Sequence, residues 1–181
     1  MISHNASPGQ PEQGPSQPIN VGMQGWEKTT AESPIIQTHG LGPCIGIAIY
    51  NPADKVGHLA HIATPGAEQQ TIADFLSSAT DNGAAAQNLQ VWVRGGQVNR
   101  QNAGSEFIGL FGRQSLVEGL TAAGISAEQM NVEWDENPVE SQGTRMKLDA
   151  TTGEFQSLVA PAPHVAQAIG QEALMGERLT H

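Results

Sequence analysis

The chain has a single cysteine, Cys44, and few basic residues, and each shortage narrows what the protein can be. One cysteine cannot form a disulfide within the chain, and a lone thiol is typical of proteins in a reducing compartment. Eight Lys and Arg residues against 18 Asp and Glu residues leave a formal net charge of −10. Nucleic acids and anionic membrane surfaces both require clustered positive charge, so the composition argues against either partner.

Long apolar runs are also missing. No uninterrupted apolar stretch reaches the length of a transmembrane helix, and no basic and then apolar segment of the secretory type opens the sequence. We therefore expect no membrane insertion and a cytoplasmic location. Export by a specialised secretion route, which leaves neither signature, stays open.

The first 33 residues show no apolar periodicity. The stretch from Ser7 to Gln24 is dominated by Pro, Gly, Gln, Ser and Asn, and it cannot bury enough apolar surface to offset the entropy of ordering it. We predict a disordered tail over 1–33, a folded domain over 34–160, and a second tail or short helix over 161–181. A docking or delivery role for the first tail is the alternative.

Within the predicted domain, apolar residues recur with two different periods. Spacings of three and four predict amphipathic helices over 67–80 and 108–123. A turn at Asn51-Pro52 between two alternating segments predicts a hairpin. The mixture indicates an α+β domain. Alternation predicts short strands over 34–38, 45–50, 56–63, 89–93, 130–134, 144–148 and 155–159.

Cys44 ends a glycine-rich turn, and His61 lies on the second strand of the predicted hairpin. The cysteine can be a buried small apolar residue, a metal ligand or a reactive thiolate. In the third case the imidazole takes the thiol proton, which makes the two residues a candidate nucleophile and base. Gly42 would let the backbone approach a substrate closely, whereas Pro43 has no amide hydrogen to offer an oxyanion. A purely structural turn remains the alternative.

A metal site at His58 and His61 is disfavoured by their spacing. On an extended strand, residues at an odd separation point to opposite faces, and no pair of carboxylates or thiolates supports the two imidazoles. We expect no metal and no cofactor.

The segment from Thr38 to Cys44 and several later segments form an ordered set. Thr38-His39-Gly40-Leu41-Gly42-Pro43-Cys44 resembles the Thr and Leu-Gly-Ser-Cys pattern of the CheD family, the chemoreceptor glutamine deamidases of bacterial chemotaxis, and the spacing from Cys44 to His61 matches. The likeness covers roughly residues 34–160. It continues through Gly95-Gly96, Ile108-Gly109, Gly143-Thr144-Arg145 and Asp149-Ala150-Thr151-Thr152-Gly153.

The resemblance implies a three-layer α/β/β sandwich with mixed sheets and two main amphipathic helices, related to the bacterial cysteine deamidase toxins. It implies Cys44 as nucleophile, His61 as general base and acid, and Thr38 as the group that orients the imidazole. We expect Gly42, Gly95 and Gly96 to contact substrate. The reaction would hydrolyse a glutamine side-chain amide to glutamate through a thioester. Chemoreceptor cytoplasmic regions would be the substrate, and a chemotaxis phosphatase would be a further partner.

Departures from the pattern, such as Pro43 in place of the usual Ser, leave the target open. One alternative is a deamidase acting on another glutamine-containing protein, including a secreted effector. Another is a non-catalytic interaction module of chemotaxis signalling. His39 is either a bystander or a contact to His61 or substrate. Arg94 is either an exposed structural arginine or a recognition group for an acidic segment. The sequence predicts packing roles for Trp26, Trp92 and Trp134.

Overall fold

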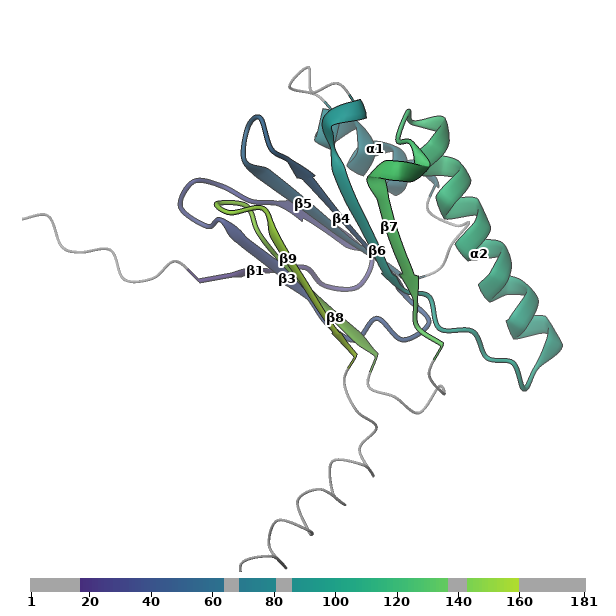
Figure 1. The fold of residues 1–181 in the computed structure, drawn as a ribbon. Coiled ribbons are helices and arrows are strands. Elements are labelled where there is room, and N and C mark those ends of the chain that lie inside the picture. The colour runs from purple at the N-terminus through teal and green to yellow at the C-terminus, as the bar shows by residue number, and fades with distance from the viewer. Residues whose placement is uncertain (1–16, 64–68, 81–85, 137–142, 160–181) are drawn as a thin grey trace, which may run out of the picture.

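The computed structural model describes residues 17–63, 69–80, 86–136 and 143–159, which build three layers. Two helices cover one face of a five-stranded sheet, and a four-stranded sheet packs against its other face (Figure 1). The helices are α1 (Gln69–Thr80) and α2 (Ala103–Ala122). Among the described residues, no helix has the length and apolarity needed to cross a membrane.

The five-stranded sheet has the order β2-β5-β4-β6-β7, and the four-stranded sheet has the order β1-β3-β8-β9. Each contains one parallel pair, β6 with β7 and β1 with β3, beside antiparallel pairs. The predicted three-layer sandwich with mixed sheets is therefore confirmed. The strands are β1 (Ile19–Asn20), β2 (Gly25–Lys28), β3 (Ile35–Thr38), β4 (Ile45–Asn51), β5 (Val56–Ile62), β6 (Gln90–Gly95), β7 (Met130–Trp134), β8 (Thr144–Asp149) and β9 (Glu154–Val159).

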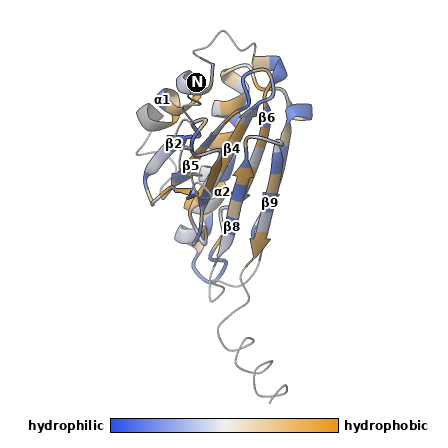
Figure 2. Ribbon diagram, turned by 90° about the vertical axis from the view of Figure 1, so that its left-hand side faces the viewer, coloured by the Kyte–Doolittle hydropathy of each residue, from blue (hydrophilic) through white to orange (hydrophobic). Residues whose placement is uncertain are grey.

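Strand β4 is buried on both sides and separates two apolar cores. Ile45, Ile47 and Ile49 face the helices and pack with residues such as Phe75 of α1. Ala48 and Tyr50 face the four-stranded sheet. The hydropathy colouring in Figure 2 shows the apolar band along β4 between the layers. Because side chains alternate along a strand, the position of a residue on β4 or on a neighbouring strand determines which of the two cores its side chain faces.

The predicted tail over 1–33 is wrong in its second half. Ile19–Asn20 pairs in parallel with β3, and Gly25–Lys28 pairs antiparallel with β5, so both segments belong to the sheets. Backbone hydrogen bonds to the neighbouring strands stabilise these two segments despite their polar composition. Residues 1–16 and the predicted helix or tail over 161–181 lie outside the described residues.

Helix α2 starts five residues earlier than its apolar periodicity predicts. Asn102 caps it, and the side-chain oxygen accepts hydrogen bonds from the amides of Gly104 (3.0 Å) and Ser105 (3.1 Å). The additional turn carries Phe107, which is exposed, so apolar spacing alone could not mark the true start.

Candidate active site

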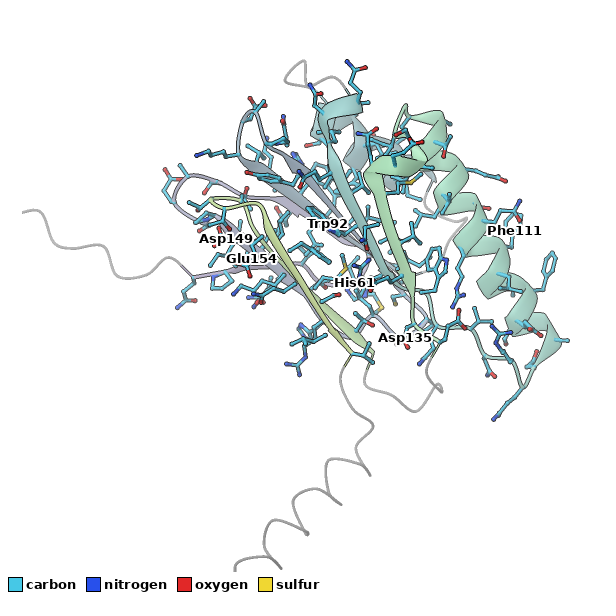
Figure 3. All side chains as sticks on the ribbon, in the orientation of Figure 1. His61, Trp92, Phe111, Asp135, Asp149 and Glu154 are labelled. Atoms are coloured by element: carbon cyan, nitrogen blue, oxygen red, sulfur yellow. The ribbon has the colours of Figure 1, made fainter. Side chains whose placement is uncertain are left out.

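Cys44 and His61 lie on the same face of the five-stranded sheet. Gly46 of β4 is directly opposite His61 of β5, and Cys44 precedes Gly46 by two positions. Residues in such a diagonal relation have Cα atoms about 7–8 Å apart, with their Cβ atoms somewhat closer. Cys44 belongs to the core between the sheets, and His61 likewise lies between the sheets near the centre of the molecule (Figure 3). The hairpin therefore brings the thiol and the imidazole into one neighbourhood, as predicted.

Thr38 fixes the orientation of the His61 ring from the other sheet. Its hydroxyl donates to the carbonyl oxygen of Val21 at 2.7 Å and lies 2.8 Å from Nδ1 of His61. A hydroxyl has one hydrogen, and a carbonyl oxygen can only accept. The Thr38 oxygen must therefore accept from the Nδ1–H of His61, which places the proton of the neutral ring on Nδ1 and the lone pair on Nε2.

The Nε2 atom of His61 is the available base. It is buried and has no hydrogen-bond partner among the described residues, an arrangement that costs about 1–3 kcal/mol for a buried polar atom. Burial, followed by the positive charge of nearby His39, lowers the pKa of His61 below 6.5. His61 is accordingly neutral at pH 7 and can accept a proton. Since the imidazolium is disfavoured, we expect only modest activation of the resting thiol.

The thiol and the imidazole are largely buried. Cys44 is 7% exposed and His61 is 5% exposed. Leu41 and Met146 occupy the space over Gly46, directly opposite His61, and a Cβ on Gly46 would come within 2.6 Å of Leu41. Glycine at position 46 thus makes room for two apolar side chains at the position paired with His61.

The turn before Cys44 is held by backbone hydrogen bonds from two distant segments. The carbonyl of Cys44 accepts from the amide of Gly96 at 2.7 Å, and that of Gly42 accepts from Gln97 at 2.8 Å. On the other side, the amide of Leu41 donates to Thr144 at 3.1 Å. Each glycine of the Gly95-Gly96 pair has a positive φ. A Cβ at position 95 would overlap the carbonyl oxygen of Cys44, so this close approach requires glycine.

Arg113 of α2 supports the same turn through Gly96. Its Nε donates to the carbonyl oxygen of Gly96 at 2.7 Å, and its guanidinium lies 5.0 Å above the ring of Trp134 and pairs with Glu136. The amide of Gly96 in turn holds Cys44. The buried arginine therefore connects the helical layer to the backbone beside the thiol.

The predicted substrate-contacting glycines are all in this region, and all are buried. Gly42 lies within the turn, and Gly95 and Gly96 pack behind it. The two histidines of β5 are separated, as their spacing predicts. His58 lies under α1 with its ring 6.4 Å from that of Phe75, on the opposite face from His61. They cannot share an ion.

Arg94 is not the exposed arginine that the sequence suggested. It is buried between the sheets, where Nε donates to Ser157 of β9 at 3.0 Å and the terminal nitrogens donate to Asn131 of β7. Its role is structural. The packing roles of the tryptophans are confirmed by Trp26 against Phe75 and by Trp92 stacked on Phe155.

Three contributors were missed from the sequence. The backbone carbonyl of Val21 accepts a hydrogen bond from Thr38. A backbone carbonyl has no side-chain signature, so the sequence could not point to it. Gln97 packs beside Gly42, where a Cβ would lie 3.6 Å from its side-chain oxygen. Arg113 is a charged residue of an amphipathic helix, and nothing in the sequence marks it as buried. Its burial is visible only in the tertiary structure.

Comparisons with known proteins agree with the motif. No protein-family model matches the chain. A probable chemoreceptor glutamine deamidase CheD of Haloarcula marismortui is 30% identical over 158 residues, covering 80% of this chain and 87% of the relative. That of Pyrococcus abyssi is 27% identical over 135 residues, covering 75% and 79% respectively. Among solved structures, YlmD from Geobacillus stearothermophilus has a TM-score of 0.45 at 14% identity and covers 69% of this chain and 60% of that one. The Haloarcula match spans most of both sequences, and the chain belongs to the CheD family.

Proposed function

We propose that the protein hydrolyses glutamine side-chain amides of other proteins to glutamate, with chemoreceptor cytoplasmic regions as substrate. The observation that carries the proposal is the contact between Thr38 and His61, which leaves the buried Nε2 unprotonated on the face that carries Cys44. The printed names of the CheD relatives support the same activity. Because the proposed substrate is the cytoplasmic region of a receptor, the proposal implies that the protein acts in the cytoplasm.

In the proposed mechanism, the thiol of Cys44 attacks the amide carbon of the glutamine while its proton passes to Nε2 of His61. The tetrahedral intermediate collapses when His61 returns that proton to the leaving nitrogen, so ammonia departs and a thioester remains. Water then attacks the thioester, giving up a proton to His61, and the thiol and a glutamate are released. The amide of Cys44 or of a neighbour serves as the oxyanion donor, because Pro43 has none.

Thr38 acts on the imidazole rather than on substrate. A neutral hydroxyl orients the ring and accepts from Nδ1–H, but it stabilises the imidazolium less than a carboxylate would. Sγ and Nε2 form no hydrogen bond in the resting structure. Catalytic contacts of this kind often tighten only in the substrate complex. Gly95 and Gly96 pack behind the turn and hold the Cys44 backbone, and Gly42, within the turn, is the proposed point of close approach for the substrate.

The reaction is tested with purified receptor cytoplasmic fragments, following ammonia release and the Gln-to-Glu mass shift. Wild type should convert specific glutamines, whereas Cys44→Ala should not, and Cys44→Ser should show at most a trace because a hydroxyl is a much weaker nucleophile. If wild type and Cys44→Ala are indistinguishable, the protein is not a deamidase of these fragments. Proteome-wide mass spectrometry for new deamidation sites then tests the alternative of another protein target.

A second proposed function, binding a chemotaxis phosphatase, rests on the first turns of α2. Phe107 is 70% exposed and Phe111 is 53% exposed, and their rings stack at 6.2 Å. Ile108 and Leu110 extend the same exposed apolar surface. Such patches are characteristic of interaction sites. Calorimetric titration with a purified chemotaxis phosphatase should give saturable binding, and the absence of binding would contradict this role.

A further inference from the structure

The outer face of the four-stranded sheet has a hollow of 400 Å³. Residues of β3 and β8 alternate there, so that Thr38 and Met146 are buried toward the core while Gln37, Arg145 and Lys147 lie on the solvent side. We call this hollow the basic groove, and its polar side chains are those of Asn20, Gln37, His39, Arg145, Lys147 and Gln156.

The strand register arranges the basic groove in rows. Lys147 lies between Gln37 on β3 and Gln156 on β9, and Asn20 on β1 extends that row. The amide of Gln37 donates to Asn20 at 2.8 Å, which holds one side of the row in place. Arg145 is two positions before Lys147 and lies opposite Leu158 of β9, in the next row on the same face. The two cations therefore project side by side from one strand.

The charge of the basic groove is opposite to that of the chain. The whole sequence carries −10, yet no carboxylate is among the described residues that line this hollow. The two buried arginines each form an ion pair, Arg94 with Glu133 and Arg113 with Glu136. Arg145 and Lys147 make no ion pair within the described ranges. Two available cations in a hollow of an acidic protein favour an acidic ligand.

The basic groove adjoins the candidate active site. Thr38 lines it through β3, and its hydroxyl on the inner face of the same strand binds His61. His39, the next residue, also lines the groove and is near enough for its charge to lower the pKa of His61. Arg145 directly follows Thr144, whose carbonyl accepts from the turn that leads to Cys44. A chain lying in the groove would thus end beside the catalytic turn.

We propose that the basic groove binds an acidic segment of the protein substrate next to the target glutamine, and so selects glutamines flanked by Asp or Glu. The inference rests on the proposed deamidase function and names its substrate class. Strands in a sheet are about 4.8 Å apart and an extended chain advances about 3.3 Å per residue, so three strands accommodate roughly three or four peptide residues. An acidic peptide fits that dimension, and its carboxylates can pair with Arg145 and Lys147.

The experiment compares two peptides that carry one glutamine, one with Glu residues on both sides and one with Ser at the same positions. Wild type should deamidate the acidic peptide with about tenfold lower KM, because two exposed ion pairs contribute on that order. The advantage should shrink between low and high salt. Arg145→Gln/Lys147→Gln should raise the KM for the acidic peptide about tenfold, with the loss in KM rather than kcat.

A matched control removes two positive charges elsewhere. Lys28 and Lys55 are exposed on the five-stranded sheet and in the β4–β5 turn, and Asn tolerates the positive φ of position 55. Lys28→Gln/Lys55→Asn should retain the preference of wild type. If both double variants lose the preference equally, net charge is responsible and the groove is not the binding site.

Binding measured without turnover separates this inference from the proposed function. In the Cys44→Ala background, fluorescence anisotropy with the labelled acidic peptide should show salt-sensitive binding that Arg145→Gln/Lys147→Gln weakens about tenfold. That result supports the groove even if no ammonia is released, in which case only the deamidase proposal fails. Equal binding by both proteins overturns the groove, while Cys44-dependent ammonia release would leave the deamidase proposal intact.

Discussion

Replacing Thr38 by valine tests the proposed state of His61 directly. Valine has nearly the same shape as threonine but cannot accept from Nδ1–H or donate to Val21, so two buried hydrogen bonds of 2.8 Å and 2.7 Å are lost. The net worth of such a bond is about 1 kcal/mol, rising to about 3 kcal/mol where a buried group is left unpaired. If these hydrogen bonds keep the His61 ring in its reactive orientation, losing them should lower kcat by between about fivefold and about 150-fold.

The control is Thr38→Ser, which keeps the hydroxyl and should retain most of the activity. Ammonia release from receptor fragments gives the rates, and thermal unfolding shows whether each variant is folded. Nitrogen NMR of His61 supplies a readout independent of turnover. Wild type should carry the ring proton on Nδ1, and Thr38→Val should contain both tautomers. A proton on Nε2 in wild type, or equal activity losses in the Ser and Val variants, would refute the reasoning.

Two further predictions follow from the lowered histidine pKa values. His61 must be neutral to accept the thiol proton, so kcat/KM should persist on acidification below pH 6.5 and fall only as pH passes through the lowered pKa. A pH–rate profile checks this, and half-loss of activity above pH 6.5 contradicts it. Burial, followed by the charge of Lys28, lowers the pKa of His58 to about 4. Between pH 6.5 and about 4 the unfolded chain therefore carries a proton on His58 that the folded chain does not. Stability is therefore fully present above pH 6.5 and is lost as pH falls through that window, by about 3 kcal/mol. Urea unfolding at several pH values should show a smaller loss for His58→Phe, and identical pH dependence would count against it.

Local patterns in the sequence were enough to place the hairpin. Alternation in Ile45, Ile47 and Ile49 and the turn at Asn51-Pro52 depend on neighbours in the chain, and the observed pairing of β4 with β5 confirms them. The odd spacing of His58 and His61 likewise predicted opposite faces. These features follow from the two-residue period of a strand, which operates whatever the rest of the fold does.

Segments whose structure depends on distant partners were harder to predict. Gly25–Lys28 has the composition of a tail but is hydrogen-bonded along β5, so partner strands outweigh local propensity. Arg94 looked exposed because charged residues usually are, yet it lies between the sheets, where Asn131 and Ser157 satisfy its donors. Neither partner is near it in the sequence, so neither could be inferred from local pattern.

The sequence by itself determined which residues can do chemistry here: one thiol, an imidazole on the next strand and a threonine before the turn, in an acidic chain without a second cysteine. Only the tertiary structure decided what state those groups are in. The proton of His61 is assigned because Val21, from a segment that resembles a tail, accepts the single hydrogen of Thr38. Burial and hydrogen-bond direction arise from contacts between layers, and strand periodicity carries no information about either.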